Sequence, residues 1–66
     1  MDILETIALN IKKLRKEKGI SQETLALKAN IDRTYINDVE NAKRNISIKM
    51  LEKISVALEI NIKQLL

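Results

Sequence analysis

The sequence predicts an all-α protein, a compact bundle of five helices, and three observations carry that prediction. The 66 residues include no proline and one glycine, so the tight turns that join β-strands lack their usual residues. Apolar residues make up 45% of the chain and recur at spacings of three and four, the period of an amphipathic helix. Side chains that cap helix N-termini stand just before these apolar stretches, at Ser21, Asp32, Ser47 and Asn61.

The first helix is expected over residues 3–18. Its apolar stripe consists of Leu4, Ile7, Ala8, Ile11 and Leu14. Gly19 follows at the position where a left-handed residue ends a helix. Basic residues crowd the last turns, namely Lys12, Lys13, Arg15, Lys16 and Lys18. Because cations are favourable at the negative end of a helix dipole, this cluster has an explanation that needs no nucleic-acid partner.

Two short helices are expected next, separated by a tight turn. Ser21 caps the first of them. Asn30 tolerates the left-handed backbone of a turn better than most residues, and Asp32 caps a third helix over residues 33–41. The inward residues of the two helices are Leu25, Ala26, Ala29, Ile36 and Val39.

A polar loop over residues 42–46 leads to the last two predicted helices. Ser47 caps the fourth helix. The apolar set of that helix is Ile48, Leu51, Ile54, Ala57 and Leu58. Asn61 caps a short fifth helix. The apolar residues of this last helix are Ile62, Leu65 and Leu66.

The stretch from Gln22 to Val39 has the steric pattern of a helix-turn-helix. Two short helices can lock at a steep angle only if their point of contact is small and the turn is permissive. Ala26 supplies the small contact, and Asn30 supplies the turn. The apolar wedge that both helices share consists of Leu25, Ile31, Ile36 and Val39.

The composition excludes several classes of function. Cysteine and histidine are both absent, which removes disulfides, ordinary zinc and haem sites, thiol nucleophiles and imidazole bases. We therefore expect no enzyme activity, no metal and no cofactor. Tyr35 is the only aromatic residue, whereas proteins that bind single-stranded nucleic acid by stacking need several aromatic faces.

Charge and hydropathy point to a soluble protein with an anionic partner. Twelve Lys and Arg against nine Asp and Glu give a net charge of +3, which is compatible with nucleic-acid binding. No window approaches the roughly 18 apolar residues of a membrane span, and the N-terminus lacks a secretory signal. We expect a cytoplasmic protein that does not enter a membrane.

Residues 9–60 resemble the Cro and phage-repressor type of helix-turn-helix domain, often called Xre-type. The matching stretches are IKKLRKEKGISQETLALKANI, DRTYINDVENAKRNISI and LEKISVAL. Within that family, RTYI followed by an acid and then RNISI is most similar to the controller proteins of restriction–modification systems. These are small dimeric regulators that time expression of the restriction gene. The resemblance implies a DNA-binding domain with the fold of lambda repressor.

In that arrangement the third helix lies in the major groove, with its N-terminal residues towards base edges. The side of this helix opposite its core residues presents Thr34 and Asn41, with Asn37 and Asp38 beside them and Arg33 at the first turn. The residues expected to contact bases are Arg33, Thr34 and Asn37. Arginine can pair bidentately with guanine, threonine can touch a thymine methyl, and asparagine matches the donor and acceptor of adenine. Tyr35 flanks the first turn, where it either packs half-buried or contacts DNA. The alternative for Arg33 is a solvated charge.

Phosphate contacts are expected from residues that flank the third helix. Gln22 matches the family position at which a side chain and backbone N–H groups hold a phosphate. A polar run leaves the helix on its other side, consisting of Asn41, Lys43, Arg44 and Asn45. The resemblance also implies that Arg44 can reach a base. The alternative for Lys43 and Arg44 is a hydrophilic loop without a contact.

Two acidic residues of this helix have different roles. Glu40 aligns with the family position that forms an ion pair with an arginine late in the first helix, here Arg15, so both are expected to be structural. Asp38 departs from the pattern, because an acid on the DNA-facing side repels phosphate. It either accepts a hydrogen bond from a cytosine amino group or restrains Thr34 or a lysine.

The C-terminal residues are expected to join two copies of the chain, with residues 1–66 forming a single domain. One recognition helix reads only a few base pairs, and a two-fold pair doubles the readout. An apolar patch beyond the core of the first four helices usually marks an interface. Its residues are Ile60, Ile62, Leu65 and Leu66. The alternative is that the fifth helix folds back and completes the core.

The sequence therefore predicts a regulator of transcription that binds double-stranded DNA as a homodimer on a palindromic operator, most like a controller protein. A repressor needs only to occupy the promoter, whereas an activator must also contact RNA polymerase with the surface of the dimer. The alternatives are an antitoxin, a phage-type repressor, or a protein-binding module that uses the same fold. No small-molecule ligand is expected.

Overall fold

Four α-helices and one short 3-10 helix make up the fold of residues 2–66, which a computed structural model describes. The α-helices are α1 (Ile3–Glu17), α2 (Gln22–Ala29), α3 (Arg33–Glu40) and α4 (Ile48–Leu58), and the 3-10 helix is η1 (Ile62–Leu65). Because no strand occurs within residues 2–66, the prediction of an all-α protein is confirmed. None of the helices in this range is long and apolar enough to cross a membrane.

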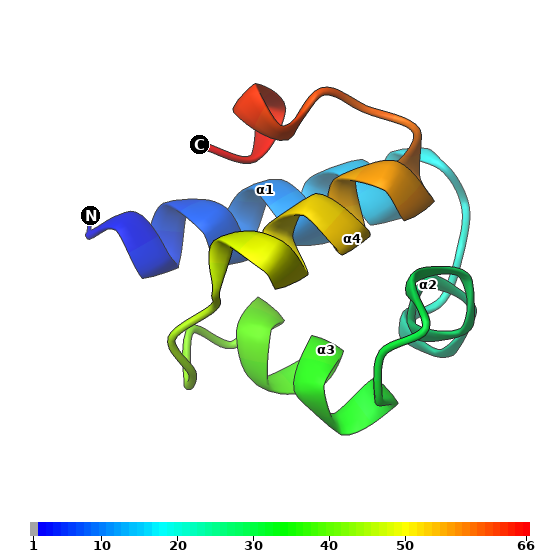
Figure 1. The fold of residues 1–66 in the computed structure, drawn as a ribbon, viewed down its shortest axis with the longest axis horizontal. Coiled ribbons are helices and arrows are strands. Elements are labelled where there is room, and N and C mark those ends of the chain that lie inside the picture. Colours follow the sequence, from blue (N-terminus) through cyan, green and yellow to red (C-terminus); the bar gives the residue numbers. More distant parts are fainter. Residues whose placement is uncertain (1) are drawn as a thin grey trace.

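The helices pack so that α3 lies on one side of the molecule. α2 packs on α3 and on α4, α1 packs on α3, and η1 lies against α1 and α4. In Figure 1, α2 is seen almost end-on while α3 runs across the lower part of the view, so the two helices cross steeply. The C-terminal end lies on the opposite side of the molecule from α3. The steep crossing is the one that the helix-turn-helix pattern predicts.

The predicted helix starts are confirmed. Each expected N-cap accepts a hydrogen bond from a backbone N–H in the following turn, at distances of 2.7–3.1 Å. These caps are Ser21, Asp32, Ser47 and Asn61. Asp2 adds a cap that was not predicted, with reciprocal bonds to Glu5 at 2.9 and 3.2 Å.

Left-handed residues end several helices. Gly19 (φ 70°) and Asn30 (φ 56°) have the left-handed conformation that the sequence predicts for them. Ala42 (φ 55°) and Glu59 (φ 58°) have it as well, although neither residue type favours it. Helix periodicity gives no indication of these last two positions, because the strain is imposed by where the chain must go next.

The core draws on every element. The largest fully buried side chains are Ile11, Leu25, Ile36, Ile54, Leu58 and Leu65. Ile48 was expected on the apolar face of α4, and this expectation is wrong, since the side chain is 78% exposed. Ile48 is the first residue of α4, and periodicity places a side chain on a face without showing whether a neighbour covers that end of the helix.

The fifth helix differs from its prediction, because it is a four-residue 3-10 helix rather than an α-helix. Its backbone bonds join residues three apart, from Gln64 N to Asn61 O at 2.9 Å and from Leu66 N to Lys63 O at 3.1 Å. A segment of this length is too short to repay the cost of nucleating an α-helix, and a 3-10 turn satisfies its end groups.

Leu65 requires a correction to the predicted dimer interface. The side chain is fully buried in the core and is therefore not available to a second copy of the chain. Its backbone carbonyl accepts a hydrogen bond from the Asn10 side chain at 3.0 Å, which ties η1 to α1. For this residue the alternative holds, in which the last helix completes the core. Leu66, in contrast, is 58% exposed.

Candidate nucleic-acid interface

One exposed face of α3 carries the residues predicted to read bases. α3 turns Ile36 and Val39 into the core, as predicted, and Glu40 is buried with them. Arg33, Thr34 and Asn37 are exposed and together line a groove of about 260 Å³. We call this feature the α3 groove. The structure therefore brings three of the four predicted base-contacting residues together, and the fourth, Tyr35, is half-buried beside them.

The turn between α2 and α3 gives this face its position. Asn30 N donates to Leu27 O at 3.2 Å and Ile31 N donates to Ala26 O at 2.9 Å, closing the end of α2 around the left-handed Asn30. Ala26 is 4% exposed, so its methyl group fits in the closely packed core. A small contact residue and a permissive turn thus set the direction in which α3 leaves α2.

A buried ion pair fixes α3 to α1. Arg15 Nε donates to Glu40 Oε2 at 2.7 Å and Arg15 Nη2 donates to Glu40 Oε1 at 3.0 Å, so the pair expected from the family resemblance is present. Arg15 Nη1 also donates to Ile20 O at 2.9 Å. The hydrogen bond to Glu40 raises the pKa of Arg15, against the opposing effect of burial. The pair holds the C-terminal end of α3 in place.

A chain of side-chain hydrogen bonds connects this ion pair to the α3 groove. Gln22 Nε2 donates to Glu40 Oε1 at 3.0 Å, and Asn37 Nδ2 donates to Gln22 Oε1 at 3.1 Å. Asn41 Nδ2 donates to Asn37 O at 2.8 Å and to Asn37 Oδ1 at 3.3 Å. The amide of Asn37 is thereby held with a donor towards α2 and an acceptor towards Asn41.

This chain of bonds was not predicted from the sequence. Gln22 was expected to contact phosphate, and the structure shows its amide engaged at both ends by protein groups. Gln22 is half-buried at the start of α2, whereas Asn41 is exposed at the end of α3. Fifteen positions separate Gln22 from Asn37 and no local pattern connects them, so only the packing of α2 on α3 brings them together.

The partner of Asp38 is Arg44, and not Thr34 or a lysine as the sequence suggested. Arg44 Nη2 lies 3.4 Å from Asp38 Oδ2. The Arg44 guanidinium also lies over the Tyr35 ring, 4.7 Å from its centroid, within the range of a cation–π contact. Lys43 and Asn45, on either side of Arg44, are exposed.

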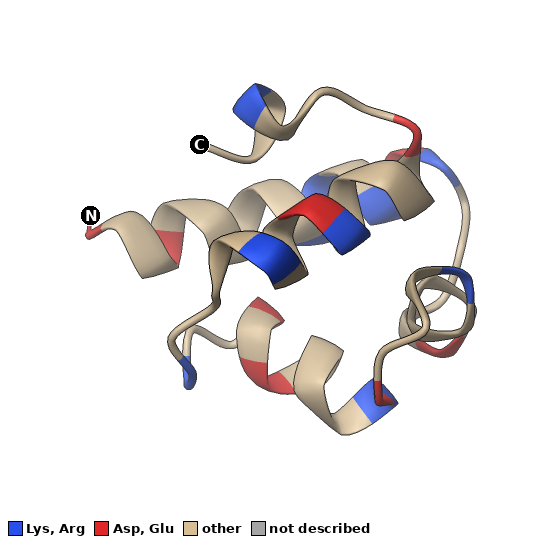
Figure 2. Cartoon of the chain, in the orientation of Figure 1, with Lys and Arg blue, Asp and Glu red and all other residues tan. Residues whose placement is uncertain are grey.

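Basic residues lie beyond both ends of the acidic segment of α3. Figure 2 shows a basic residue at the first turn of α3 and another in the loop after it, with acidic residues in the last turns between them. By sequence these are Arg33 on one side and Lys43 and Arg44 on the other. A duplex laid along α3 would meet positive charge on both sides, which suits its two phosphate backbones.

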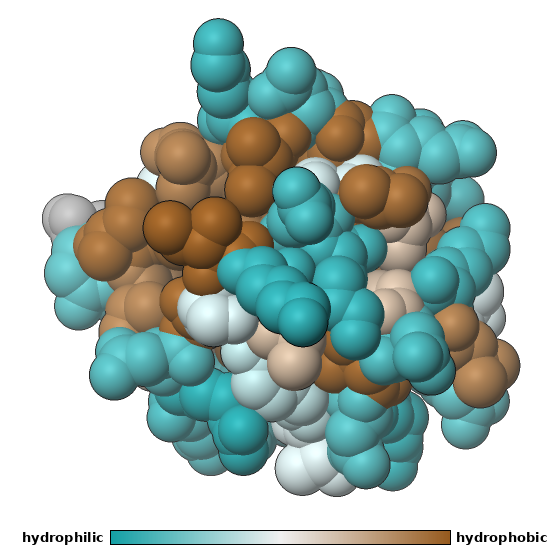
Figure 3. Space-filling view, viewed as in Figure 1, coloured by the Kyte–Doolittle hydropathy of each residue, from teal (hydrophilic) through white to brown (hydrophobic). Residues whose placement is uncertain are grey.

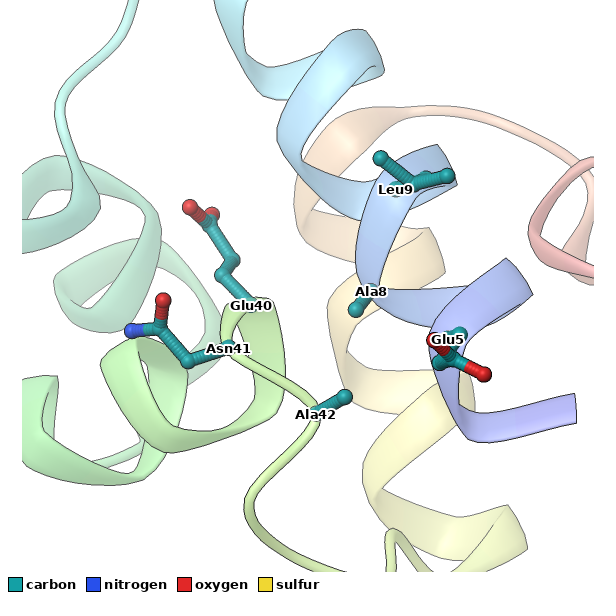
Figure 4. A pocket seen from close by; sticks show the side chains of 6 residues that line it. All are labelled: Glu5, Ala8, Leu9, Glu40, Asn41 and Ala42. Atoms are coloured by element: carbon teal, nitrogen blue, oxygen red, sulfur yellow. The ribbon is translucent and has the colours of Figure 1, made fainter. Parts of the chain in front are cut away.

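A second hollow, of about 320 Å³, lies at the other end of α3 and has different chemistry. Figure 4 shows that its walls come from the first half of α1 and from the residues around the end of α3. They are Glu5, Ala8, Leu9, Glu40, Asn41 and Ala42. Two carboxylates and several apolar groups line it, without a basic side chain among those six residues. Glu40 is already paired with Arg15, and no basic side chain among the six offers a phosphate a contact, so the α3 groove is the better candidate for nucleic acid.

Comparison with known proteins agrees with this geometry. The sequence profile of the family described as helix-turn-helix matches residues 11–65. The control protein C.MunI from Mycoplasma sp is 48% identical over 65 residues, covering 97% of this chain and 88% of that protein.

Two solved structures are also similar. The restriction-modification controller protein C.AhdI from Aeromonas hydrophila has a TM-score of 0.93 and 38% sequence identity, and the match covers 96% of each chain. The controller protein C.Esp1396I, solved as a tetramer in complex with its natural 35 base-pair operator, has a TM-score of 0.88 and 42% identity. That match covers 98% of this chain and 96% of the other.

Proposed function

Because the chain belongs to the helix-turn-helix family, we propose that it is a sequence-specific, DNA-binding regulator of transcription. More specifically, it acts as the controller protein of a restriction–modification system and binds a palindromic operator as a homodimer. The observation that supports this proposal is the α3 groove, where three of the four predicted base-contacting side chains lie exposed on one face of α3. The controller proteins to which the chain is similar, one of them solved on its operator, support the same assignment.

In the proposed complex, α3 enters the major groove and its first two turns read base edges. Arg33 is exposed and pairs bidentately with a guanine. Thr34 contacts a thymine methyl or a base acceptor, and Asn37 uses its oriented amide to recognise adenine. Tyr35 lies at the side of this face, and the Arg44 guanidinium covers its ring. Tyr35 therefore contacts DNA through the edge of its ring and its hydroxyl.

Phosphates are held on both sides of α3. Lys43 and Asn45 are exposed after the end of α3 and reach one strand. The N-terminus of α2 faces the other strand, where its backbone N–H groups hold a phosphate. Gln22, whose amide is engaged by Glu40 and Asn37, adds to this contact only through the second hydrogen of its amide nitrogen. Asn41, which donates to Asn37, adds a phosphate contact at the end of α3, whereas Arg44, which is paired with Asp38, can also reach a base. These contacts fix the register of the protein on the duplex without selecting a sequence.

Residues 1–66 form one DNA-binding unit that pairs through its C-terminal side. Figure 3 shows apolar side chains gathered where the C-terminal end, the beginning of α1 and the beginning of α4 meet. Leu66, at the C-terminal end, is 58% exposed, while Ile60, which follows the end of α4, and Ile62 are half-buried. These three residues remain from the predicted interface after the exclusion of Leu65. Pairing through this side leaves the α3 groove of each copy uncovered, and both grooves reach one duplex only if the two-fold axis turns them towards the same face of the dimer.

The dimer regulates transcription either by occupying a promoter or by contacting RNA polymerase. A dimer on a promoter represses by excluding RNA polymerase. A dimer beside a promoter activates if its own surface contacts the polymerase, and the sign of the effect depends on where the operator lies.

The alternative of a protein-binding module loses its main support. An acid on the DNA-facing side weakly favours that alternative, and this acid, Asp38, is paired with Arg44. An antitoxin and a phage-type repressor use the same DNA-binding geometry, and the neighbouring genes distinguish them. A methyltransferase and a restriction enzyme gene beside this one support a controller protein, whereas a toxin gene supports an antitoxin.

Selection from a randomised pool of duplex DNA tests the proposal. We expect the full chain to enrich a palindromic sequence, and hydroxyl-radical footprinting on that duplex to show two protected half-sites about one helical turn apart. The chain would not be a sequence-specific regulator if it enriched no sequence and its affinity for DNA varied with salt concentration but not with the DNA sequence.

A further inference from the structure

Asp38 is an acid on the DNA-facing side of α3, which the proposed function leaves unexplained. Resting on that proposed function, we propose that Asp38 is a specificity-determining residue. It holds the Arg44 guanidinium against the Tyr35 ring, so that Arg44 is presented to base edges and is withheld from the phosphates of non-cognate DNA. The juxtaposition of Asp38, Arg44 and Tyr35, which we call the arginine clamp, carries the inference.

The backbone after α3 brings Arg44 to this position. Ala42 is left-handed (φ 55°), and its N–H donates to Val39 O at 3.0 Å. The next N–H, of Lys43, donates to Asp38 O at 2.9 Å. These two bonds close the end of α3 in a Schellman arrangement and turn the chain back on itself. Arg44 therefore lies beside residues one and two turns earlier in the helix instead of extending away from it.

Only part of the Arg44 guanidinium is used by the protein. Its Cζ lies over the Tyr35 ring, 4.7 Å from the centroid, and one nitrogen, Nη2, reaches Asp38 at 3.4 Å. An arginine has five N–H donors in a planar fork, and 47% of this side chain is exposed. The remaining donors are thus available to an external acceptor while the clamp restrains the guanidinium. A planar pair of N–H donors is the group that hydrogen-bonds bidentately to guanine.

The clamp is better suited to direct Arg44 than to stabilise the fold. Both side chains are partly exposed, and exposed ion pairs contribute little to stability because water screens them and ordering long side chains opposes them. The Asp38 carboxylate instead accepts the hydrogen bond from Arg44 that a phosphate would otherwise accept. On non-cognate DNA, Arg44 gains a phosphate only by leaving Asp38, which then faces the duplex without a partner.

The experiment compares the wild-type chain with Asp38→Asn, which keeps the shape of the side chain and removes its charge. The probes are the duplex that the wild-type chain selects from a randomised pool and a scrambled duplex of the same composition. We expect Asp38→Asn to bind the scrambled duplex up to about fivefold more tightly, the upper range for one exposed ion pair. The released Arg44 adds a phosphate contact, so the slope of log affinity against log salt steepens by about 0.9 per protomer. Affinity for the selected duplex rises less, and the ratio of the two affinities falls.

Two further variants keep the result specific to the clamp. Glu52→Gln removes one negative charge from the exposed side of α4 and is expected to leave the salt slope unchanged. In Arg44→Ala, the additional change Asp38→Asn is expected to have no further effect on the slope. Circular dichroism confirms that each variant is folded.

Three outcomes overturn the inference. The first is an equal gain from Glu52→Gln, which would assign the effect to net charge. The second is a gain from Asp38→Asn that persists without Arg44, which would mean that Asp38 repels phosphate directly. The third is an unchanged affinity ratio in Asp38→Asn. If the wild-type chain selects no sequence at all, it is the proposed function that fails, so the two failures are distinguishable.

Discussion

Arg33 and Lys43 lie on different sides of α3, and we expect them to contribute to DNA binding in different ways. Arg33→Ala should weaken binding to the selected duplex by about 1–3 kcal/mol and relax discrimination at one guanine, because a bidentate base contact is lost. Lys43→Ala should weaken binding to every duplex alike and reduce the salt slope by about 1, because a phosphate contact is lost. Fluorescence anisotropy on single-base variants of the selected duplex, at several salt concentrations, separates the two. Equal losses on selected and scrambled duplexes for both variants would show that these roles are wrong.

The ion pair of Arg15 and Glu40 makes a prediction about stability. Glu40→Ala leaves the Arg15 guanidinium buried without its carboxylate, so we expect a loss of about 3 kcal/mol in the free energy of unfolding. The double change Arg15→Met with Glu40→Leu removes both charges and should be much closer to wild type. Urea unfolding at low temperature measures the two. A double variant as unstable as Glu40→Ala would mean that shape, and not an unpaired charge, sets the loss.

Single residues were predictable where the backbone alone decides their role. A cap must precede a helix and a turn residue must tolerate a left-handed φ, so Ser21, Asp32 and Asn30 could be found from the sequence. The contacts of Gln22 and Arg44 could not be found from the sequence, because each depends on how one segment of the chain packs against another. The ion pair of Arg15 and Glu40 was found only through resemblance to a family.

At the scale of the helix, substitutions at two left-handed helix ends are expected to change the free energy of unfolding in opposite directions. Glu59 ends α4 at φ 58° and ψ 43°, where a side chain is strained, so Glu59→Gly should raise the free energy of unfolding by about 0.5–1 kcal/mol. Gly19→Ala should lower it by a similar amount. No heavy atom lies within 4 Å of the Cβ that Gly19→Ala would add, so the loss comes from the backbone at φ 70° and not from a collision.

Thermal unfolding followed by circular dichroism checks both changes. A shift of this size in a small domain moves the midpoint by roughly 3–6 °C, upward for Glu59→Gly and downward for Gly19→Ala. A lower midpoint for Glu59→Gly would indicate that the Glu59 side chain stabilises the end of α4 by more than its backbone strain costs.

The helices themselves followed from the period of their apolar residues, and the errors lie at their ends. Periodicity gave α1 to α4, because each has enough turns to show a stripe. It gave the wrong type for η1, since one turn of 3-10 helix and one of α-helix place apolar residues almost alike. It also placed Ile48 inside, because a stripe does not reveal where its covering neighbour ends.

For the whole molecule, the different exposure of the last two residues allows folding and dimerisation to be tested separately, because Leu65 is buried and Leu66 is exposed. Leu66→Asp alters an exposed side chain, so we expect a folded protein whose sedimentation shifts from dimer towards monomer. Leu65→Asp places a charge in the core, so we expect loss of the folded state, seen as loss of helical signal. An unchanged dimer in Leu66→Asp would remove the C-terminal side as the interface.

The arrangement of the molecule as a whole was the least accessible to prediction from sequence. The apolar residues after α4 fitted both a core and an interface, and the sequence favoured the interface for all four of them. The structure divides them, with Leu65 inside and Leu66 outside, because consecutive residues of a short 3-10 turn point in different directions. Which residues fall on each side depends on how η1 lies against α1 and α4.

The hydrogen-bond chain from Arg15 to Asn37 has a consequence for redesign of DNA preference. Within residues 2–66, the side chains of Arg33 and Thr34 have no hydrogen-bond partner, so a library that varies these two positions explores new operators without disturbing the scaffold. Asn37 differs, because its amide supplies the donor that Gln22 uses, and Gln22 in turn contacts Glu40. A retargeting effort should therefore randomise positions 22 and 37 jointly, as a covarying pair.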